Sequence, residues 1–329
     1  MILYLILFLR NLIDEKEDST TITILAQNYL MSIQVQQVSK VYGAQKALDQ
    51  ISFEINKGEI VGFLGPNGAG KSTMMKIICG YLPPSTGQVS VCDLPVYEHE
   101  LLVKQKIGYL PEHNPLYLDQ YVKEFLDFIA DIHQIPNKKE RIAEVIGLTG
   151  LSLEQNKKIS ALSKGYRQRV GIAQAIIHDP EVLILDEPTT GLDPNQIVEI
   201  RQLIQKIGAE KTVMLSTHIM QEVEAICSRA IIVNRGQVVA DQSVQDLKNN
   251  NQKFIFEIEF EKPCSKEFFL SIKGILFIDQ LAADKYCIHC ENENVRKAIV
   301  EESLKSNNLL TQITRKGESL EHIFQQLTK

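Results

Sequence analysis

Long hydrophobic runs are scarce in this chain of 329 residues. The longest uninterrupted apolar stretch covers residues 1–9, which is about half of what a bilayer-spanning helix needs. It also lacks the basic start and the small-residue cleavage site of a secretory signal. We therefore expect no membrane-spanning segment. Residues 1–30 are expected to lie outside the fold. A new sequence pattern begins at Met31, which is also an alternative start of translation. A short membrane-touching tail is the other interpretation of this extension.

Positive charge is also in short supply, because 35 Lys and Arg face 41 Asp and Glu and leave a net charge of −6. This balance gives no electrostatic reason to expect a nucleic-acid partner. The hydrophobic fraction of 44% and the charged fraction of 23% are typical of a globular protein with a full core. At this length the chain can hold one large domain and a smaller one.

The six cysteines form no recognisable disulfide framework, and three of them lie in or beside apolar runs. A reducing cytoplasm is the simpler compartment for such a chain. The segment Cys287-Ile288-His289-Cys290 invites a metal interpretation. No second pair stands at ligand spacing, however, and a structural metal site normally needs four ligands. We therefore do not expect a metal there.

The feature that is present most clearly is the stretch IVGFLGPNGAGKST at residues 60–73. Its apolar start predicts a buried strand, its glycines predict a tight loop, and the apolar residues that follow predict a helix. The whole matches the phosphate-loop pattern G-x-x-x-x-G-K-[ST], in which backbone N–H groups and a lysine face an anion. The expected ligand is a nucleoside triphosphate with magnesium. The loop residues concerned are Gly65, Pro66, Asn67, Gly68, Ala69, Gly70, Lys71, Ser72 and Thr73.

Two alternating segments, residues 32–38 and 47–55, predict antiparallel strands before this loop. Tyr42 lies near the turn between them, where its ring would either stack on a purine base or cover the sheet edge. Short runs at residues 87–91 and 107–110 predict further strands. Helical periodicity then predicts a helical insert that ends where Ser163 can cap a helix running to Ile177.

A nearly unbroken apolar run, residues 181–185, predicts a parallel strand covered on both faces. It places Asp186 and Glu187 at its carboxyl end, where open α/β sheets bind ligands. We expect one carboxylate to serve magnesium and the other to serve water. The strand predicted at residues 212–216 ends beside His218, which can donate a hydrogen bond to a phosphate oxygen.

The last 80 residues have a different texture. Residues 249–251 are a polar break, residues 254–260 alternate, and further strands and a helix are predicted up to residue 304. We expect a small α+β domain over residues 250–329, after a main domain over residues 31–246.

These motifs together resemble the ATPase domains of ABC transporters over about residues 32–245. The resemblance is carried by GPNGAGKST, LSKGYRQR, VLILDEP, the GLDP segment and His218, in the family's order and spacing. It implies an α/β P-loop ATPase fold with an antiparallel β subdomain and a helical subdomain at about residues 112–178. More narrowly, GYLPEHNPLY, LSKGYRQRVG and LSTHIMQEVEAICSR resemble the ATP-binding subunits of gliding-motility-associated ABC transporters.

The resemblance also implies a role for each matching residue. Lys71 and the loop glycines would hold the β- and γ-phosphates of ATP, and Tyr42 would stack on adenine. Ser72 and Asp186 would ligate Mg²⁺. Glu187 would polarise the attacking water, and His218 would contact the γ-phosphate.

In this family ATP lies between two subunits, so the resemblance implies a homodimer of ATPase domains. Ser163 and Gly165 of one chain would then cap the nucleotide held by the other, as the free N–H groups of a helix N-terminus can. Asp193 would lie at the subunit contact.

Two residues depart from the family pattern. Glu112 stands where a glutamine is usual, so its contact to magnesium or water would come from a carboxylate that lacks an amide donor. The signature usually read LSGGQ is here LSKGY, with Lys164 and Tyr166 substituted. Because the serine and second glycine remain, we expect the phosphate capping to survive.

The function that follows is an ATP-driven subunit on the inner face of the bacterial cytoplasmic membrane. Its motion would pass to separate membrane permease subunits, docked on the apolar residues 115–118 unless these are buried in the helical insert. A soluble ABC ATPase acting on ribosomes or DNA is the first alternative, although the chain has neither a second nucleotide domain nor a long coiled-coil insertion. A nucleotide-dependent regulator with little turnover is the second.

Overall fold

The computed structural model describes residues 31–250, 254–316 and 320–328. The predicted N-terminal extension, residues 1–30, lies outside the described residues. The chain divides into two compact units that meet between Gln242 and Ser243, a few residues before the boundary expected from composition. Each unit is described on its own.

The larger unit begins with an antiparallel sheet of strand order β2-β1-β4-β5. The alternating sequences form β1 (Met31–Tyr42) and β2 (Gln45–Asn56), which pair antiparallel as predicted. Strand β4 (Thr86–Val91) pairs with the other side of β1, and the two-residue β5 (Leu94–Pro95) forms the edge.

The second sheet of this unit is centred on parallel strands and has the order β10-β9-β3-β8-β7-β6. Strand β3 lies parallel to β8 and β9, and β7 lies parallel to β8 and β6. The carboxyl ends of β3, β7 and β8 therefore meet at one edge of the sheet. The strands are β3 (Ile60–Leu64), β6 (Ile107–Leu110), β7 (Val182–Asp186), β8 (Thr212–Thr217), β9 (Arg229–Asn234) and β10 (Gln237–Ser243).

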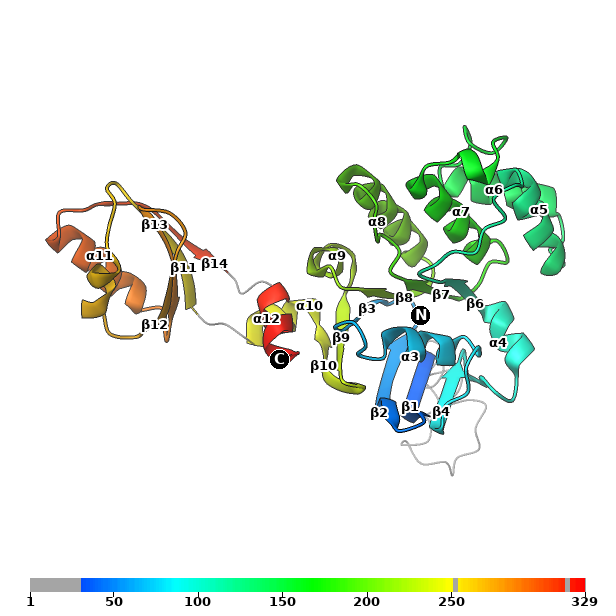
Figure 1. Cartoon of the computed structure of the whole chain (residues 1–329), viewed down its shortest axis with the longest axis horizontal. Helices are drawn as coiled ribbons and strands as arrows, with labels where there is room; N and C mark the ends of the chain where they lie inside the picture. Colours follow the sequence, from blue (N-terminus) through cyan, green and yellow to red (C-terminus); the bar gives the residue numbers. More distant parts are fainter. Residues whose placement is uncertain (1–30, 251–253, 317–319, 329) are drawn as a thin grey trace, which may run out of the picture. The chain divides into compact units, whose positions relative to one another are not determined.

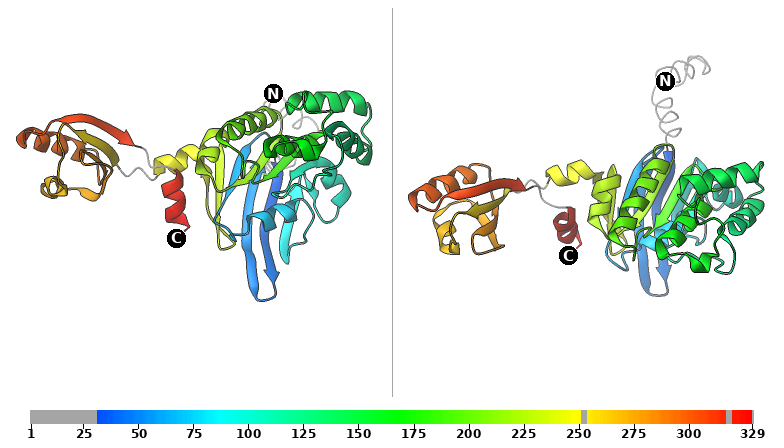
Figure 2. Two further views of the ribbon diagram at one scale, coloured as in Figure 1. Left: turned by 45° about the horizontal axis from the view of Figure 1, so that its top comes forward. Right: turned by 90° about the horizontal axis from the view of Figure 1, so that it is seen from above.

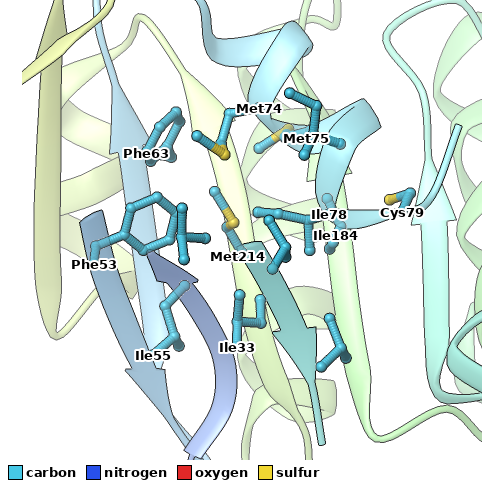
Figure 3. Packing of buried hydrophobic residues seen from close by; sticks show 14 of the residues in the cluster. Ile33, Phe53, Ile55, Phe63, Met74, Met75, Ile78, Cys79, Ile184 and Met214 are labelled. Atoms are coloured by element: carbon cyan, nitrogen blue, oxygen red, sulfur yellow. The ribbon is translucent and has the colours of Figure 1, made fainter. Parts of the chain in front are cut away.

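A single apolar core joins the two sheets through helix α3 (Lys71–Ile78). Met74, Met75 and Ile78 of this helix face buried side chains of both sheets, among them Phe53 and Met214 (Figure 3). All of these side chains are at most 5% exposed. Because α3 follows the phosphate loop directly, this packing fixes the position of the loop.

Helices surround the six-stranded sheet. Helices α5 (Val122–Ile132), α6 (Lys138–Leu148) and α7 (Lys164–Ile176) gather beside the edge formed by β6, in agreement with the predicted helical insert (Figures 1 and 2). The other helices of the unit are α4 (Glu100–Lys106), α8 (Pro194–Gly208) and α9 (Met220–Ile226). Among the described residues, no helix is long and apolar enough to cross a membrane.

The smaller unit contains an antiparallel sheet of order β12-β13-β11-β14 with its own apolar core. Helix α11 packs on this sheet through Val295 and Ile299 (Figure 1). The elements are α10 (Val244–Asn250), β11 (Phe254–Phe260), β12 (Ile275–Gln280), β13 (Lys285–Cys290), α11 (Val295–Lys305), β14 (Leu310–Lys316) and α12 (Leu320–Leu327).

Two details of this unit differ from the sequence analysis. The polar break begins inside α10, because buried Val244 and Leu247 give residues 244–250 a helical apolar face. Strand β14 and helix α12 were not predicted. Cys287 and Cys290, considered above as metal ligands, lie on β13. The part of the chain that the structure describes holds no group of three or more His, Cys, Asp or Glu residues that could bind a metal ion.

Candidate active site

The phosphate loop joins β3 to α3 and depends on glycine at defined positions. Gly70 has φ 106°, and a Cβ atom there would lie 2.6 Å from the carbonyl oxygen of Ala47. At Gly65 a Cβ atom would lie 2.4 Å from the carbonyl oxygen of Val233. Only glycine therefore lets the loop fold this closely against its neighbours. The loop ends at the N-terminus of α3, which presents backbone N–H groups to an anion.

Lys71 opens α3 and is only 7% exposed. Its ammonium donates hydrogen bonds to the carbonyl oxygens of Gly65, at 2.8 Å, and Pro66, at 3.4 Å. Among the described residues no carboxylate neutralises it. Because only neutral carbonyl oxygens hold this ammonium, it suits an anionic ligand such as a phosphate group.

Asp186 is the last residue of β7 and Glu187 comes directly after it, at the strand end where they were predicted. Asp186 is 3% exposed and accepts a hydrogen bond from the hydroxyl of Ser216 on β8, at 2.5 Å. This bond occupies Oδ1 and fixes the rotamer, so Oδ2 remains for another ligand. Burial raises the pKa of the Cys79 thiol, and the nearby Asp186 raises it further.

Glu187 and His218 form a hydrogen-bonded pair. The Nδ1 atom of His218 lies 2.9 Å from Oε2 of Glu187, and the hydroxyl of Thr190 donates to the same oxygen at 3.0 Å. The Glu187 side chain is 10% exposed whereas the His218 ring is 55% exposed. The carboxylate is thus held from two sides, and the imidazole faces open space.

These groups line one cavity of about 650 Å³. Tyr42 lines it too and is 47% exposed. Glu112 is also part of the wall. The lining residues are Tyr42, Gln45, Ala47, Asn67, Gly68, Gly70, Lys71, Ser72, Thr73, Glu112, Asp186, Glu187, Thr190 and His218.

Three of these residues were missed by the sequence analysis: Gln45, Ala47 and Thr190. Gln45 and Ala47 belong to the start of β2, and their place in the wall depends on how the two sheets pack. Thr190 could have been found, because it lies three residues after Glu187 in the loop that leaves the same strand end.

Six predicted residues do not line this cavity: Gly65, Pro66 and Ala69, which belong to the loop itself, and Ser163, Gly165 and Asp193, which lie elsewhere. Ser163 accepts a hydrogen bond from the N–H of Tyr166 and caps α7, at 3.4 Å. Asp193 caps α8 through the N–H of Gln196, at 2.9 Å. The two helix starts are neighbours, since a Cβ atom on Gly165 would lie 2.6 Å from the side chain of Gln196.

The geometry fits a nucleoside triphosphate. The cavity has a stackable ring at Tyr42, a helix N-terminus, and the buried ammonium of Lys71. It also fits Mg²⁺, which is usually held by one or two protein oxygens together with substrate phosphates. The donors present for it are the Ser72 hydroxyl and the Asp186 carboxylate, both in the cavity wall.

Such a fold and site define a P-loop nucleoside triphosphatase, and comparison with known proteins gives the family. A family profile described as ABC transporter matches residues 48–190. The bacitracin transport ATP-binding protein BcrA of Bacillus licheniformis is 36% identical over 68% of this chain and 73% of its own length. The ABC transporter ATP-binding protein YxlF of Bacillus subtilis is 28% identical over 89% of this chain and 98% of its own length.

Solved structures agree. The cbiO1 protein of Clostridium perfringens, part of the ABC transporter complex cbiONQ, has a TM-score of 0.63 at 27% identity, covering 68% of this chain and 92% of that one. The dimeric structure of MJ0796, a bacterial ABC transporter cassette, has a TM-score of 0.59 at 28% identity, covering 64% and 98%.

The chain belongs to the family of ABC transporter ATP-binding proteins. It is an ATPase, the subunit that binds and hydrolyses ATP to energise an ABC transporter. The fold class predicted from the sequence is confirmed.

Proposed function

We propose that this ATPase works as a homodimer in which each ATP contacts both chains. The observation that carries this proposal is the separation of the candidate site within one chain. Lys71, Asp186, Glu187 and His218 share one cavity, whereas Ser163, with the N-terminus of α7, does not line it. The fold likeness to the dimeric cassette MJ0796 supports the same arrangement.

Within each site we assign the following roles. Lys71 and the loop N–H groups bind the β- and γ-phosphates, and Tyr42 stacks on adenine. Ser72, Asp186 and Glu112 would hold Mg²⁺, and the ion would neutralise charge on the phosphates. Ser163 and Gly165 cap the nucleotide of the other chain, and Asp193 lies at the contact between the chains.

Glu187 acts as the base that orients the attacking water. Its carboxylate is fixed by Thr190 and His218, so its lone pairs have a defined direction. His218 donates toward the γ-phosphate from the ring atom that does not face Glu187. Holding both groups in one hydrogen-bonded pair means that water and phosphate are positioned together.

Coupling would run to separate membrane permease subunits, and we propose that these dock on a surface formed by residues 115–118. Tyr117 and Leu118 are 53% and 46% exposed, so this surface is not buried in the helical insert. Tyr117 packs edge-on against Phe125 of α5, at 5.8 Å between ring centroids. Bound to such subunits, the protein would work at the inner face of the bacterial cytoplasmic membrane.

Co-purification tests the partner. The wild-type chain, extracted with detergent from its own organism, should bring down membrane permease subunits, and the Tyr117→Asp, Leu118→Asp double variant should not, while still binding ATP. Leu153→Asp is the matched control, because Leu153 is 90% exposed outside this surface. Recovery of ribosomes or DNA instead of permeases would support a soluble ABC ATPase.

We further propose that the transporter is an exporter linked to gliding motility. The support is the likeness of GYLPEHNPLY, LSKGYRQRVG and LSTHIMQEVEAICSR to that group. Deleting the gene in its host should abolish spreading on a surface and leave growth in liquid unchanged. Normal spreading of the deletion strain would refute this assignment.

A further inference from the structure

A buried carboxylate outside the cavity has no part in the chemistry described so far. Glu222 on α9 is 1% exposed, although glutamate is rarely buried so completely unless it is paired. Burying a charge is costly and requires strong hydrogen-bond partners. The hydrogen-bond partners of Glu222 therefore indicate its role.

The two carboxylate oxygens of Glu222 join two separate loops. Thr189, in the loop after β7, donates its hydroxyl to Oε1. Thr217, at the end of β8, donates its hydroxyl to Oε2 at 2.8 Å and accepts the N–H of Ile219 at 3.1 Å. Arg201 of α8 lies 3.9 Å from Oε1 and supplies compensating charge. Helices α8 and α9 and strand β8 are neighbours in Figure 1.

Each of these threonines is adjacent to a group that lines the cavity. Thr189 precedes Thr190, whose hydroxyl donates to Glu187, and Thr217 precedes His218, whose ring contacts the same Glu187 oxygen. Glu222 and Glu187 thus hold the same pair of loops at two points. The first point is buried and the second lies in the cavity.

We propose that Glu222 is a positioning residue that sets the spacing between Glu187 and His218. The inference rests on the roles proposed above for these two residues. When the buried contacts of Glu222 are intact, the spacing between the Glu187 loop and the His218 loop is fixed. When these contacts are loosened, the Glu187 carboxylate and the His218 imidazole lose their alignment. A misplacement of a catalytic group by about 1 Å is enough to lower the rate on the order of 100-fold.

The first test is Glu222→Gln, which keeps the shape but offers one acceptor oxygen instead of two, so one threonine hydroxyl loses its acceptor. We expect kcat for ATP to fall between about 10- and 100-fold, with KM within about twofold of wild type. Glu224→Gln is the matched control, because Glu224 is exposed on the same helix, and it should leave both constants unchanged. An unchanged kcat in Glu222→Gln overturns the proposal.

A second pair of variants covers the case in which Glu222→Gln folds poorly. Thr189→Val removes the hydroxyl at constant volume and should lower kcat, whereas Thr189→Ser keeps the hydroxyl and should restore it. Equal loss in the two variants would mean that packing, and not the hydrogen bond to Glu222, matters.

A double-variant cycle separates positioning from general stability. Adding Glu222→Gln to His218→Ala should lower kcat no further, because the partner to be aligned is gone. Additive losses contradict the inference. If His218→Ala alone retains wild-type turnover, the proposed function fails and the inference falls with it. If His218→Ala is inactive while Glu222→Gln is normal, the inference alone fails.

Discussion

At the scale of single residues, the site depends on backbone conformations that cannot be predicted from the sequence pattern. Glu187 has a positive φ of 51°, which is uncommon for a residue other than glycine. In this conformation its N–H donates toward both Oγ and the carbonyl oxygen of Ser216, at 3.1 and 3.2 Å. Such local strain is concentrated at functional sites.

Sequence reasoning located Asp186, Glu187 and His218 correctly at one sheet edge, because parallel strands with apolar runs end there together. It could not find the contact between Glu222 and Thr189. Nothing in the spacing of a single glutamate on a short helix distinguishes a buried position from an exposed one, since the neighbouring Glu224 is exposed. Such pairings depend on how α9 packs, which only the folded chain defines.

His178 carries a prediction about pH. Its ring is stacked on His133, with centroids 4.1 Å apart, and its Nε2–H donates to the carbonyl oxygen of Ile107 at 3.0 Å. Burial, followed by the charge of His133, lowers the pKa of His178 to about 4. Because an unfolded chain has a histidine pKa of about 6.5, the unfolded state binds more protons below that pH. Stability should therefore fall as the pH decreases from about 6.5 toward 4.

Thermal unfolding across this pH range checks the prediction. The variant His178→Gln keeps a donor for Ile107 but cannot titrate, so its Tm should decline less steeply with falling pH than that of wild type. Parallel curves for the two proteins would show that His178 is not the group responsible.

At the scale of elements, the phosphate-loop region and the sheets were predictable while several short elements were not. The strand predicted at residues 107–110 is confirmed with these bounds as β6, and the apolar start of the phosphate-loop stretch forms β3, because each is a short apolar run of a covered parallel strand. Strand β14 has the sequence LTQITRK, which lacks a clear alternation, and it forms by pairing with β11. Its strand structure therefore comes from tertiary context.

Helix α8 allows a test of capping that is separate from catalysis. Asp193 accepts the N–H of Gln196, so Asp193→Ala should destabilise the protein by about 1 kcal/mol. For a unit of this size that lowers Tm by about 2–4 °C. Asp193→Asn retains an acceptor and should keep most of the stability. If Asp193 also lies at the proposed subunit contact, the alanine variant should in addition weaken ATP-dependent dimerisation, measured by gel filtration. Equal Tm values for the alanine and asparagine variants would contradict the capping role.

At the scale of the whole molecule, the proposed dimer would combine two half-sites that lie apart in each chain. The cavity contains the groups proposed to bind and activate ATP, and the paired N-termini of α7 and α8 form a second surface with free N–H groups. The family resemblance implied this division, because in that family ATP lies between two subunits. How the smaller unit, which begins at Ser243, contributes could not be predicted, because a sheet with an ordinary core carries no recognisable chemistry.

The measurement that tests the shared site most directly uses Glu187→Gln, which keeps the shape of the side chain but removes the base. With ATP and Mg²⁺ this variant should bind nucleotide, lose most of its turnover and elute from gel filtration as a dimer, whereas without ATP it should not dimerise. Rapid hydrolysis by Glu187→Gln would contradict the role of Glu187, and a monomer saturated with ATP would contradict the shared site.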